Sequence, residues 1–315
     1  MQNNILITGG AGFIGSYLAD ELVKTAGRVV VVDNLSLGRE ANLSSALKSG
    51  KCELVVGDIL DKTLLSDVFY KHSFDVVFHL AANSDVASST ANPAIDKDNT
   101  FLTTYEVLNA MRIHNVKRIV FASSSAVYGD AGGMPLGEDY APLLPASHYG
   151  AAKLASEAFI SSFVENYGFQ AWFARFPNVC GGRATHGVLY DFINKLRKNP
   201  SELEVLGDGT QRKPYLYVQE LVEAMLYIYK HSDAQINLFN IGGVGETSVS
   251  EIAEMLVAKL GLSATIRYGS GARGWVGDVP KFAYKLDKLN ALGWRAKLSS
   301  TEAVSYAIDA LIRGA

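Results

Sequence analysis

The stretch "ILITGGAGFIGSYLADEL" (5–22) places a β-branched run, a glycine-rich turn and a helical pattern in direct succession. Its glycines Gly9, Gly12 and Gly15 have the spacing G-x-x-G-x-x-G. Glycines at such a turn let the backbone bend sharply and approach a pyrophosphate, whose charge is favoured at a helix N-terminus. The stretch therefore predicts the first strand and the first helix of a dinucleotide-binding fold.

Further short apolar runs follow along the first half of the chain, with helical patterns between them. They are Val29–Val32, Glu53–Val56, Val76–Leu80, Arg118–Ser123 and Ala171–Phe176, after the first run at Asn4–Thr8. Most are continuous rather than alternating in polarity, which is typical of strands buried on both faces. The alternation of strand and helix predicts an α/β fold with a doubly wound parallel sheet of the Rossmann type.

The pattern becomes less regular after about Phe176, where glycine-rich turns interrupt it. We predict a dinucleotide-binding domain at 1–175, to which a strand and a helix return at about 214–240. The segments 176–213 and 241–315 are expected to form mainly a smaller α/β lobe that binds the substrate.

Composition excludes several classes of protein. The chain is 48% hydrophobic and 19% charged, which allows a sizeable core, and its formal net charge of −3 argues against a nucleic-acid partner. The two cysteines, Cys52 and Cys180, suggest neither a metal site nor a disulfide framework and fit a reducing compartment. We find no signal-peptide pattern and no membrane-spanning run, so we expect no membrane partner and a cytoplasmic location.

Asp33 ends the second apolar run, in "VVVVDN". A carboxylate at this position of a dinucleotide fold can accept hydrogen bonds from both hydroxyls of the adenosine ribose, and it would repel a 2′-phosphate. The sequence therefore predicts NAD rather than NADP as the cofactor.

The stretch "SHYGAAKLASEAF" (147–159) is expected to be helical, with Tyr149 and Lys153 one turn apart. The strand at 118–123 leads into three serines at the edge where parallel sheets bind ligands. If the helix packs beside that edge, serine, tyrosine and lysine converge near the nicotinamide. A phenol of pKa about 10 then needs roughly 4 kcal/mol of stabilisation to ionise near pH 7. The lysine cation, the nicotinamide and Ser124 can supply it together, so we predict Ser124, Tyr149 and Lys153 as catalytic residues.

Motifs along almost the whole chain point to one family. They are "TGGAGFIG", "VDNLSLG", "GDILD", "VVFHLAA", "SSSAVYG", "YGAAK", "RFPNVCGGR", "GDGTQ" and "GDVP". Together they resemble the extended short-chain dehydrogenase/reductases of the nucleotide-sugar epimerase/dehydratase type. The resemblance implies a large NAD lobe, a smaller nucleotide-sugar lobe, NAD that stays bound through turnover, and a homodimer formed by two helices from each subunit.

The resemblance also implies the residues that contact each ligand. Those implied for NAD are Gly9, Gly12, Phe13, Ile14, Gly15, Asp33, Asn34, Leu35, Ser36, Gly38, Asp58, Ile59, Leu80, Ala81, Ala82, Asn99, Tyr149, Lys153 and Pro177. Those implied for the nucleotide sugar are Ser84, Ser124, Ser125, Tyr149, Asn178, Val188, Arg212, Lys213, Arg273, Asp278 and Phe282.

The chain departs from the family at two cationic positions. Lys213 and Pro214 stand where the family usually has arginine and aspartate, and Trp275 stands where it often has arginine. The diphosphate contact is therefore left open between Arg212, Lys213 and Arg273. Phe282 carries a separate prediction about the sugar. The resemblance implies that this bulky side chain lies beside the C2 substituent of the sugar and selects a 2-hydroxy sugar. The alternative is that Phe282 is a core residue that faces away from the substrate.

The residues after the serine strand separate the reactions of the family. Dehydratases carry an acidic pair there and the related decarboxylases a glutamate, but this chain has Ser125 and Ala126. The resemblance then implies UDP-sugar 4-epimerisation, most simply between UDP-glucose and UDP-galactose. UDP-glucuronate stays open as a substrate, because Ser125 or Thr185 could face a C6 carboxylate. A net NAD-dependent oxidoreductase and a non-catalytic NAD sensor are two further classes that the sequence leaves open.

Overall fold

The computed structural model describes residues 3–85, 88–271 and 279–313. Contacts within the chain divide it into two compact units. Unit 1 comprises Met1–Val127, His148–Arg175 and Val222–Phe239; unit 2 comprises Tyr128–Ser147, Phe176–Leu221 and Asn240–Ala315. The division differs from the expected one in that residues 128–147 fall in unit 2, because their contacts are made there rather than with the large sheet.

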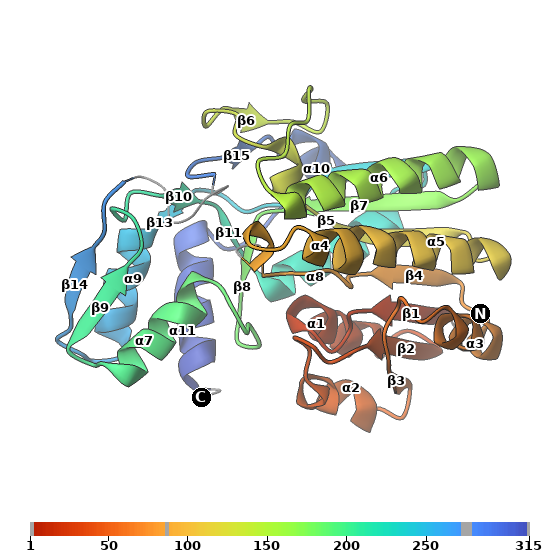
Figure 1. The fold of residues 1–315 in the computed structure, drawn as a ribbon, viewed down its shortest axis with the longest axis horizontal. Coiled ribbons are helices and arrows are strands. Elements are labelled where there is room, and N and C mark those ends of the chain that lie inside the picture. Colours follow the sequence, from red (N-terminus) through yellow and green to blue (C-terminus); the bar gives the residue numbers. More distant parts are fainter. Residues whose placement is uncertain (1–2, 86–87, 272–278, 314–315) are drawn as a thin grey trace. The chain divides into compact units, whose positions relative to one another are not determined.

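A seven-stranded sheet forms the centre of unit 1 (Figure 1). Its strand order is β12-β7-β5-β4-β1-β2-β3, so the chain starts in the middle of the sheet and winds outward in both directions. The pairings from β3 to β5 are parallel. The strands are β1 (Asn4–Thr8), β2 (Arg28–Asp33), β3 (Cys52–Val56), β4 (Val76–His79), β5 (Arg118–Ser124), β7 (Gln170–Phe176) and β12 (Ile236–Asn240). This confirms the predicted doubly wound Rossmann sheet.

Helices cover both faces of this sheet, and α3, α5 and α6 run side by side along one of them (Figure 1). The helices are α1 (Phe13–Leu22), α2 (Ser44–Lys48), α3 (Lys62–His72), α4 (Ala94–Asp96), α5 (Thr103–Ile113), α6 (His148–Tyr167) and α8 (Val218–His231), with short helical turns η1 (Glu40–Leu43), η2 (Ser88–Thr90), η3 (Lys97–Leu102) and η4 (Ser125–Tyr128).

The continuous apolar runs are explained by burial on both sides. Leu6, Val77 and Phe121 belong to the core cluster shared with α3, α5 and α6. The alternate residues Ile7 and Phe78 are equally buried, and the Phe78 ring contacts an aromatic ring of α8 on the opposite face. A strand that is covered on both faces has no polar side to show in its sequence.

Unit 2 is built from two-stranded pairs and helices. Its strands are β6 (Pro135–Leu136), β8 (Asn178–Cys180), β9 (Glu202–Val205), β10 (Arg212–Lys213), β11 (Tyr215–Tyr217), β13 (Thr247–Ser248), β14 (Thr265–Tyr268) and β15 (Ala283–Tyr284). Its helices are α7 (Val188–Lys198), α9 (Val249–Lys259), α10 (Asp287–Leu292) and α11 (Ser300–Arg313). A core cluster with residues from α7, α9, α11 and β9 holds this unit together.

One predicted strand has a different partner from the one we expected. The strand at Tyr215 was expected to return to the large sheet, but β11 pairs with β8, and β12 is the seventh strand of the large sheet. A run of three residues is too short for its own pattern to determine its partner. The helix that follows does return, since residues from Val222 onward belong to unit 1.

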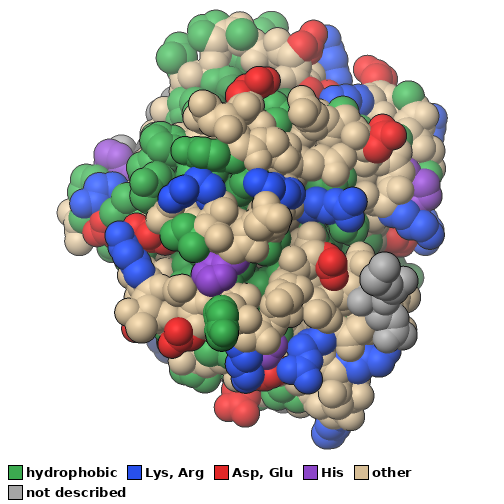
Figure 2. All heavy atoms as spheres, turned by 90° about the vertical axis from the view of Figure 1, so that its right-hand side faces the viewer, with side chains coloured by type: hydrophobic (Ala, Val, Ile, Leu, Met, Phe, Trp, Pro, Cys, Tyr) green, Lys and Arg blue, Asp and Glu red, His purple; other side chains and the backbone are tan. Residues whose placement is uncertain are grey.

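The surface carries charges of both signs. On the face of the molecule shown in Figure 2, Lys and Arg side chains are interspersed with Asp, Glu and apolar side chains. In the part of the chain that the structure describes, we find no helix with the length and apolar character needed to cross a membrane.

Candidate active site

The glycine-rich turn of unit 1 is packed too tightly for side chains. Gly9 has a φ of +69°, and a Cβ built on it would lie 2.7 Å from the backbone nitrogen of Ala81. A Cβ on Gly15 would collide with the carbonyl oxygen of Gly9 and lie 2.7 Å from Gly10 Cα. Glycine is therefore required where the turn meets the ends of β4 and α1.

The N-terminus of α1 is open to an anion. Gly12 is the N-cap, no side chain caps this end, and the first turn contains no acidic residue. The first N–H groups of a helix have no partner within the helix, and they carry partial positive charge. Together with the tight turn, this end of α1 fits the pyrophosphate of a dinucleotide.

Asp33 lies at the end of β2 and is bound to the glycine-rich turn. Its Oδ2 accepts a hydrogen bond from the backbone of Ala11 at 2.9 Å, and its Oδ1 accepts one from Leu35 at 2.8 Å. Burial raises the pKa of this carboxyl above its ordinary value, and backbone N–H groups of Leu35, Ala11 and Gly12 oppose the shift. The turn thus fixes the carboxyl beside the predicted cofactor residues.

The other predicted cofactor residues of unit 1 follow the ends of neighbouring strands. The Asn34 side chain donates to Asp58 Oδ2 at 3.2 Å, which joins the ends of β2 and β3. Ala81, just after β4, donates to Thr8 Oγ1 of β1 at 3.3 Å. Ile59 is buried, and Asn99 lies in η3. The structure therefore joins the ends of β2 and β3, and those of β1 and β4, at one edge of the sheet, as the predicted topology requires.

The predicted catalytic side chains meet at the end of β5. A hydrogen bond with the Ser124 side chain links Tyr149, in the first turn of α6, to that strand end. One turn later, Lys153 Nζ donates to the carbonyl oxygen of Ala122 at 2.7 Å. The ammonium lies 5.7 Å from the centroid of the Tyr149 ring and 4.8 Å from that of Phe121. The convergence predicted from the sequence is present within unit 1.

Burial controls the ionisation of this pair. It raises the pKa of Tyr149 to about 12, although the hydrogen bond with Ser124 lowers it. It also lowers the pKa of Lys153 to about 7, against the opposing charges of Asp96 and Glu157. Near neutral pH the tyrosine is therefore a neutral phenol in this arrangement, and an additional positive charge is needed to ionise it.

The structure distinguishes two adjacent serines that the sequence alone does not. Ser123 Oγ donates to Glu157 Oε1 at 2.5 Å, and Arg175 binds the same carboxylate with two hydrogen bonds of 2.9 and 2.6 Å. Ser123 is therefore part of a buried ion-pair network, while Ser124 bonds Tyr149. We missed Glu157 in the sequence analysis, although its position four residues after Lys153 places it on the same helix face.

A buried histidine supports the same region. His79 Nδ1 lies 2.6 Å from Thr8 Oγ1, and its Nε2 lies 3.0 Å from Thr104 Oγ1. Burial lowers the pKa of His79 to about 3, with a further contribution from the Lys153 charge. The imidazole is therefore neutral and joins β1, β4 and α5.

The nucleotide-sugar residues predicted in unit 2 lie on several of its elements. Asn178 begins β8 and Val188 begins α7. Pro177, which the resemblance assigns to NAD, also belongs to unit 2 and precedes β8. Phe282 is buried, with its ring 5.5 Å from that of Tyr284. Ser84 and Ser125 belong instead to unit 1. Two further predicted positions, Arg273 and Asp278, lie outside the described residues.

Arg212 has a specific partner within unit 2. Its guanidinium binds both carboxylate oxygens of Glu251 at 3.0 Å. Glu251 also accepts a hydrogen bond from the backbone of Ser248 and completes the capping box of α9. The backbone and side chain of Ser248 and the charge of Arg212 hold the pKa of Glu251 below its ordinary value. Arg212 is thus engaged in stabilising the start of a helix.

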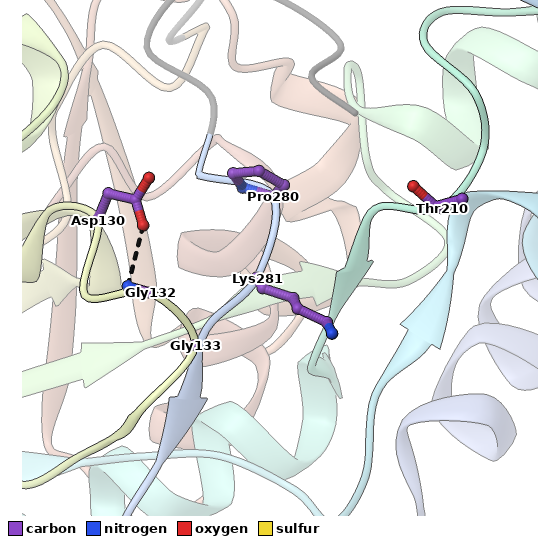
Figure 3. A pocket seen from close by; sticks show the side chains of 6 residues that line it. All are labelled: Asp130, Gly132, Gly133, Thr210, Pro280 and Lys281. Atoms are coloured by element: carbon purple, nitrogen blue, oxygen red, sulfur yellow. Dashed lines mark hydrogen bonds between the residues drawn. The ribbon is translucent and has the colours of Figure 1, made fainter. Parts of the chain in front are cut away.

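Unit 2 also contains a cavity of about 360 Å³ (Figure 3). Its lining residues are Asp130, Gly132, Gly133, Thr210, Pro280 and Lys281. The backbone of Gly132 donates to Asp130 Oδ1 at 3.1 Å. The lining includes no residue that we predicted from the sequence as a site.

A doubly wound sheet opened by this glycine turn, with serine, tyrosine and lysine at the end of β5, defines a dinucleotide-dependent enzyme of the short-chain dehydrogenase type. The chain belongs to the NAD-dependent epimerase/dehydratase family, whose model matches residues 5–242.

Named relatives are consistent with this assignment. A UDP-glucose 4-epimerase of Halalkalibacterium halodurans is 32% identical over 316 residues, covering 95% of this chain and 92% of the relative. A solved UDP-galactose 4-epimerase is 41% identical with a TM-score of 0.88, covering 98% of this chain and 99% of that one. The UDP-glucose 4-epimerase of Thermotoga maritima, solved with UDP-glucose, is 32% identical with a TM-score of 0.88 and covers 98% of both chains.

Proposed function

We propose that this protein is an NAD-dependent UDP-sugar 4-epimerase that interconverts UDP-glucose and UDP-galactose. The observation that carries the proposal is the arrangement at the end of β5, where Tyr149 is hydrogen-bonded to Ser124 and lies one helical turn from Lys153. The named relatives support the 4-epimerase activity.

The proposed mechanism uses these three side chains at the C4 hydroxyl of the sugar. When bound, NAD supplies a reversible hydride acceptor and a positive charge beside the phenol. Tyr149 accepts the C4 hydroxyl proton, and Ser124 donates a hydrogen bond to the same oxygen. Lys153 stabilises the negative phenolate oxygen, which is why its protonated form is required. Once the 4-keto sugar has turned, return of the hydride to its opposite face would invert C4, and Tyr149 returns the proton to the C4 oxygen.

The proposed cofactor site is the strand-end edge of unit 1. The uncapped N-terminus of α1 is proposed to hold the pyrophosphate, and Asp33 the adenosine ribose. Because Asp33 is 7% exposed and already accepts two backbone hydrogen bonds, little room is left beside it for a 2′-phosphate. We therefore expect the protein to prefer NAD to NADP.

The residues after β5 favour epimerisation over elimination. Ser125 and Ala126 provide no acid or base for removal of water across C5 and C6, so the proposed chemistry is confined to C4. UDP-glucuronate is the second candidate substrate, because Ser125 carries a hydroxyl that can face a C6 carboxylate. Bulky Phe282 is proposed to disfavour N-acetyl sugars at C2.

The function is tested by NMR of the purified protein incubated separately with UDP-glucose, UDP-glucuronate and UDP-N-acetylglucosamine. We expect UDP-galactose to appear from UDP-glucose without accumulation of NADH. Formation of UDP-galacturonate alone would favour the second candidate. Build-up of NADH in proportion to product would identify a net oxidoreductase and contradict the proposal.

We propose that Lys213, rather than Arg212, contacts the diphosphate of the substrate. The guanidinium of Arg212 is bound by Glu251, and Lys213 stands at the position where the family motif has its arginine. Lys213→Met should raise KM for the UDP-sugar by about ten- to hundredfold, as expected for loss of one charge-assisted hydrogen bond, with a smaller effect on kcat.

Arg212→Met is the matched control, since it removes a cation from the adjacent residue. It should lower thermal stability, because α9 loses a partner of its capping glutamate, while KM stays near that of the wild type. The assignment fails if KM rises in Arg212→Met and not in Lys213→Met. Both variants are compared by initial rates and by thermal unfolding.

We also propose a homodimer in which α5 and α6 are covered by a second copy. Phe159 of α6 is 40% exposed and contacts two other aromatic rings, Phe101 at 5.1 Å and Tyr105 at 5.9 Å. Exposed apolar clusters of this kind mark interaction surfaces. Phe159→Glu should convert the protein to a monomer in light-scattering measurements.

Tyr70→Glu provides the control for this prediction, because Tyr70 is an 83% exposed aromatic residue on α3. It should leave the mass unchanged. A wild-type protein of monomeric mass would contradict the dimer.

We also propose a cytoplasmic location. The free thiols of Cys52 and Cys180 agree with the reducing conditions of that compartment.

A further inference from the structure

Asp96 is a buried carboxylate that none of the assigned roles uses. It is the last residue of α4 and is 1% exposed. Its Oδ1 accepts a hydrogen bond from the Asn83 side chain at 2.9 Å, but its Oδ2 is buried without a hydrogen-bond partner among the described residues. An unsatisfied carboxylate oxygen in the interior costs free energy, so its presence calls for a physical explanation.

The explanation lies on the neighbouring helix. α4 packs against α6, which carries Tyr149 and Lys153. The charge of Asp96 interacts with both: it raises the pKa of Lys153 against the effect of burial, and it raises the pKa of Tyr149. Within the described part of the chain no ion pair joins Asp96 to Lys153, so the carboxylate acts on the pair through its charge.

The other titratable groups around this pair are already engaged or neutral. Glu157 on α6 is bound by Arg175 of β7, and the imidazole of His79 on β4 is neutral. On the neighbouring elements, Lys97 pairs with Asp98 on η3 and Glu106 of α5 pairs with Lys62. Arg112 of α5 donates to the Asn109 side chain. Asp96 is a carboxylate beside this pair whose second oxygen has no hydrogen-bond partner among the described residues.

We propose that Asp96 is a positioning residue that keeps Lys153 in its ammonium form beside Tyr149 inside unit 1. The inference rests on the proposed function only in assigning proton transfer to this pair. Two interacting groups lose their protons in steps that belong to the pair. A nearby negative charge opposes each of these steps, so removal of the carboxylate must move both of them, including the step that forms the phenolate, to lower pH.

Asp96→Asn tests this inference because asparagine keeps the shape of the side chain and an oxygen for Asn83 while it removes the charge. The phenolate absorbance of the NAD-loaded protein is followed against pH, with the Tyr149→Phe protein subtracted. We expect the midpoint to fall by about one pH unit, the low end for an opposite charge close to an ionisable group. The acidic and the basic limb of the pH profile of kcat/KM should both move to lower pH as well.

A purely structural role gives a different result. In that case Asp96→Asn would lower the melting temperature and the rate at every pH, while the midpoint would stay where it is, and the inference would be overturned. Asp96→Ser removes the same charge with a smaller side chain and replaces the asparagine variant if that one does not fold. Asp96→Glu keeps the charge and should retain the wild-type midpoint.

The matched control is Asp98→Asn, two residues along the chain, where the side chain is 39% exposed and paired with Lys97. Its midpoint should not move, because solvent screens a surface charge. An equal shift in this control would overturn the inference. The absorbance titration needs no turnover, so a shifted midpoint in a protein that epimerises none of the sugars would reject the proposed function and support the role of Asp96.

Discussion

Replacement of Tyr149 by phenylalanine is expected to slow the turnover of UDP-glucose by at least about a hundredfold. The change removes one oxygen, which the proposed mechanism requires to carry the C4 proton in both directions, and a positioned proton-transfer group contributes about 10²–10⁴ in rate. The ring remains, so the packing at the start of α6 is preserved. The fold and the affinity for NAD should therefore change little.

Initial rates with UDP-glucose and a titration with NAD measure the two halves of this prediction. Tyr167→Phe is the control, since it makes the same change at a 44% exposed position near the other end of α6. It should retain the wild-type rate. Ordinary activity in Tyr149→Phe would mean that another group transfers the proton.

Lys153→Met is expected to have the second large effect, with opposite consequences for activity and stability. The variant keeps a long side chain but loses the ammonium that stabilises the phenolate. We expect kcat to fall by about a hundredfold or more, and the affinity for NAD to fall as well if the ammonium binds the nicotinamide ribose as the family resemblance implies.

Stability should change in the other direction because the ammonium is buried. Lys153 is 2% exposed, and its pKa in the folded protein is lowered from 10.5 to about 7. The unfolded chain then binds more protons between these two values, so the stability of the wild type rises with pH across that window. The full cost of the buried charge is present below about pH 7 and is lost as the pH approaches 10.5.

Lys153→Met lacks this cost, so the cofactor-free variant should melt at a higher temperature than the wild type near neutral pH. The difference should shrink as the pH rises toward 10.5. Lys117→Met, at a half-buried lysine that donates to the carbonyl of Tyr167, should show neither effect. A lower melting temperature for Lys153→Met at neutral pH would mean that the lysine is bound more favourably than its burial implies.

Local sequence patterns were sufficient for six of the seven strands of the large sheet and for its glycine-rich turn. The six apolar runs correspond to β1, β2, β3, β4, β5 and β7, because strands covered on both faces leave no polar residues in their interiors. The glycines of 9–15 were equally informative, since the turn tolerates no Cβ at Gly9 or Gly15. The helix with Tyr149 and Lys153 followed from its local residue types, and the spacing of four placed both side chains on one face.

The sequence was less informative where partners are distant along the chain. Its pattern did not indicate that β11 pairs with β8, or that residues 128–147 have their contacts in unit 2. Short strands and loops have too few residues for a period to appear, so their partners are decided by packing.

The sequence by itself determined the Rossmann fold, the family and the three side chains proposed for catalysis, because each is recognised from short motifs whose own residues are adjacent in the chain. Only the tertiary structure decided how the neighbouring polar residues divide their roles. It assigned Ser123 to the Glu157–Arg175 pair, bound Arg212 to Glu251, and placed Asp96 beside α6. Burial and charge at a point depend on every element packed around it, and a linear pattern does not contain that information.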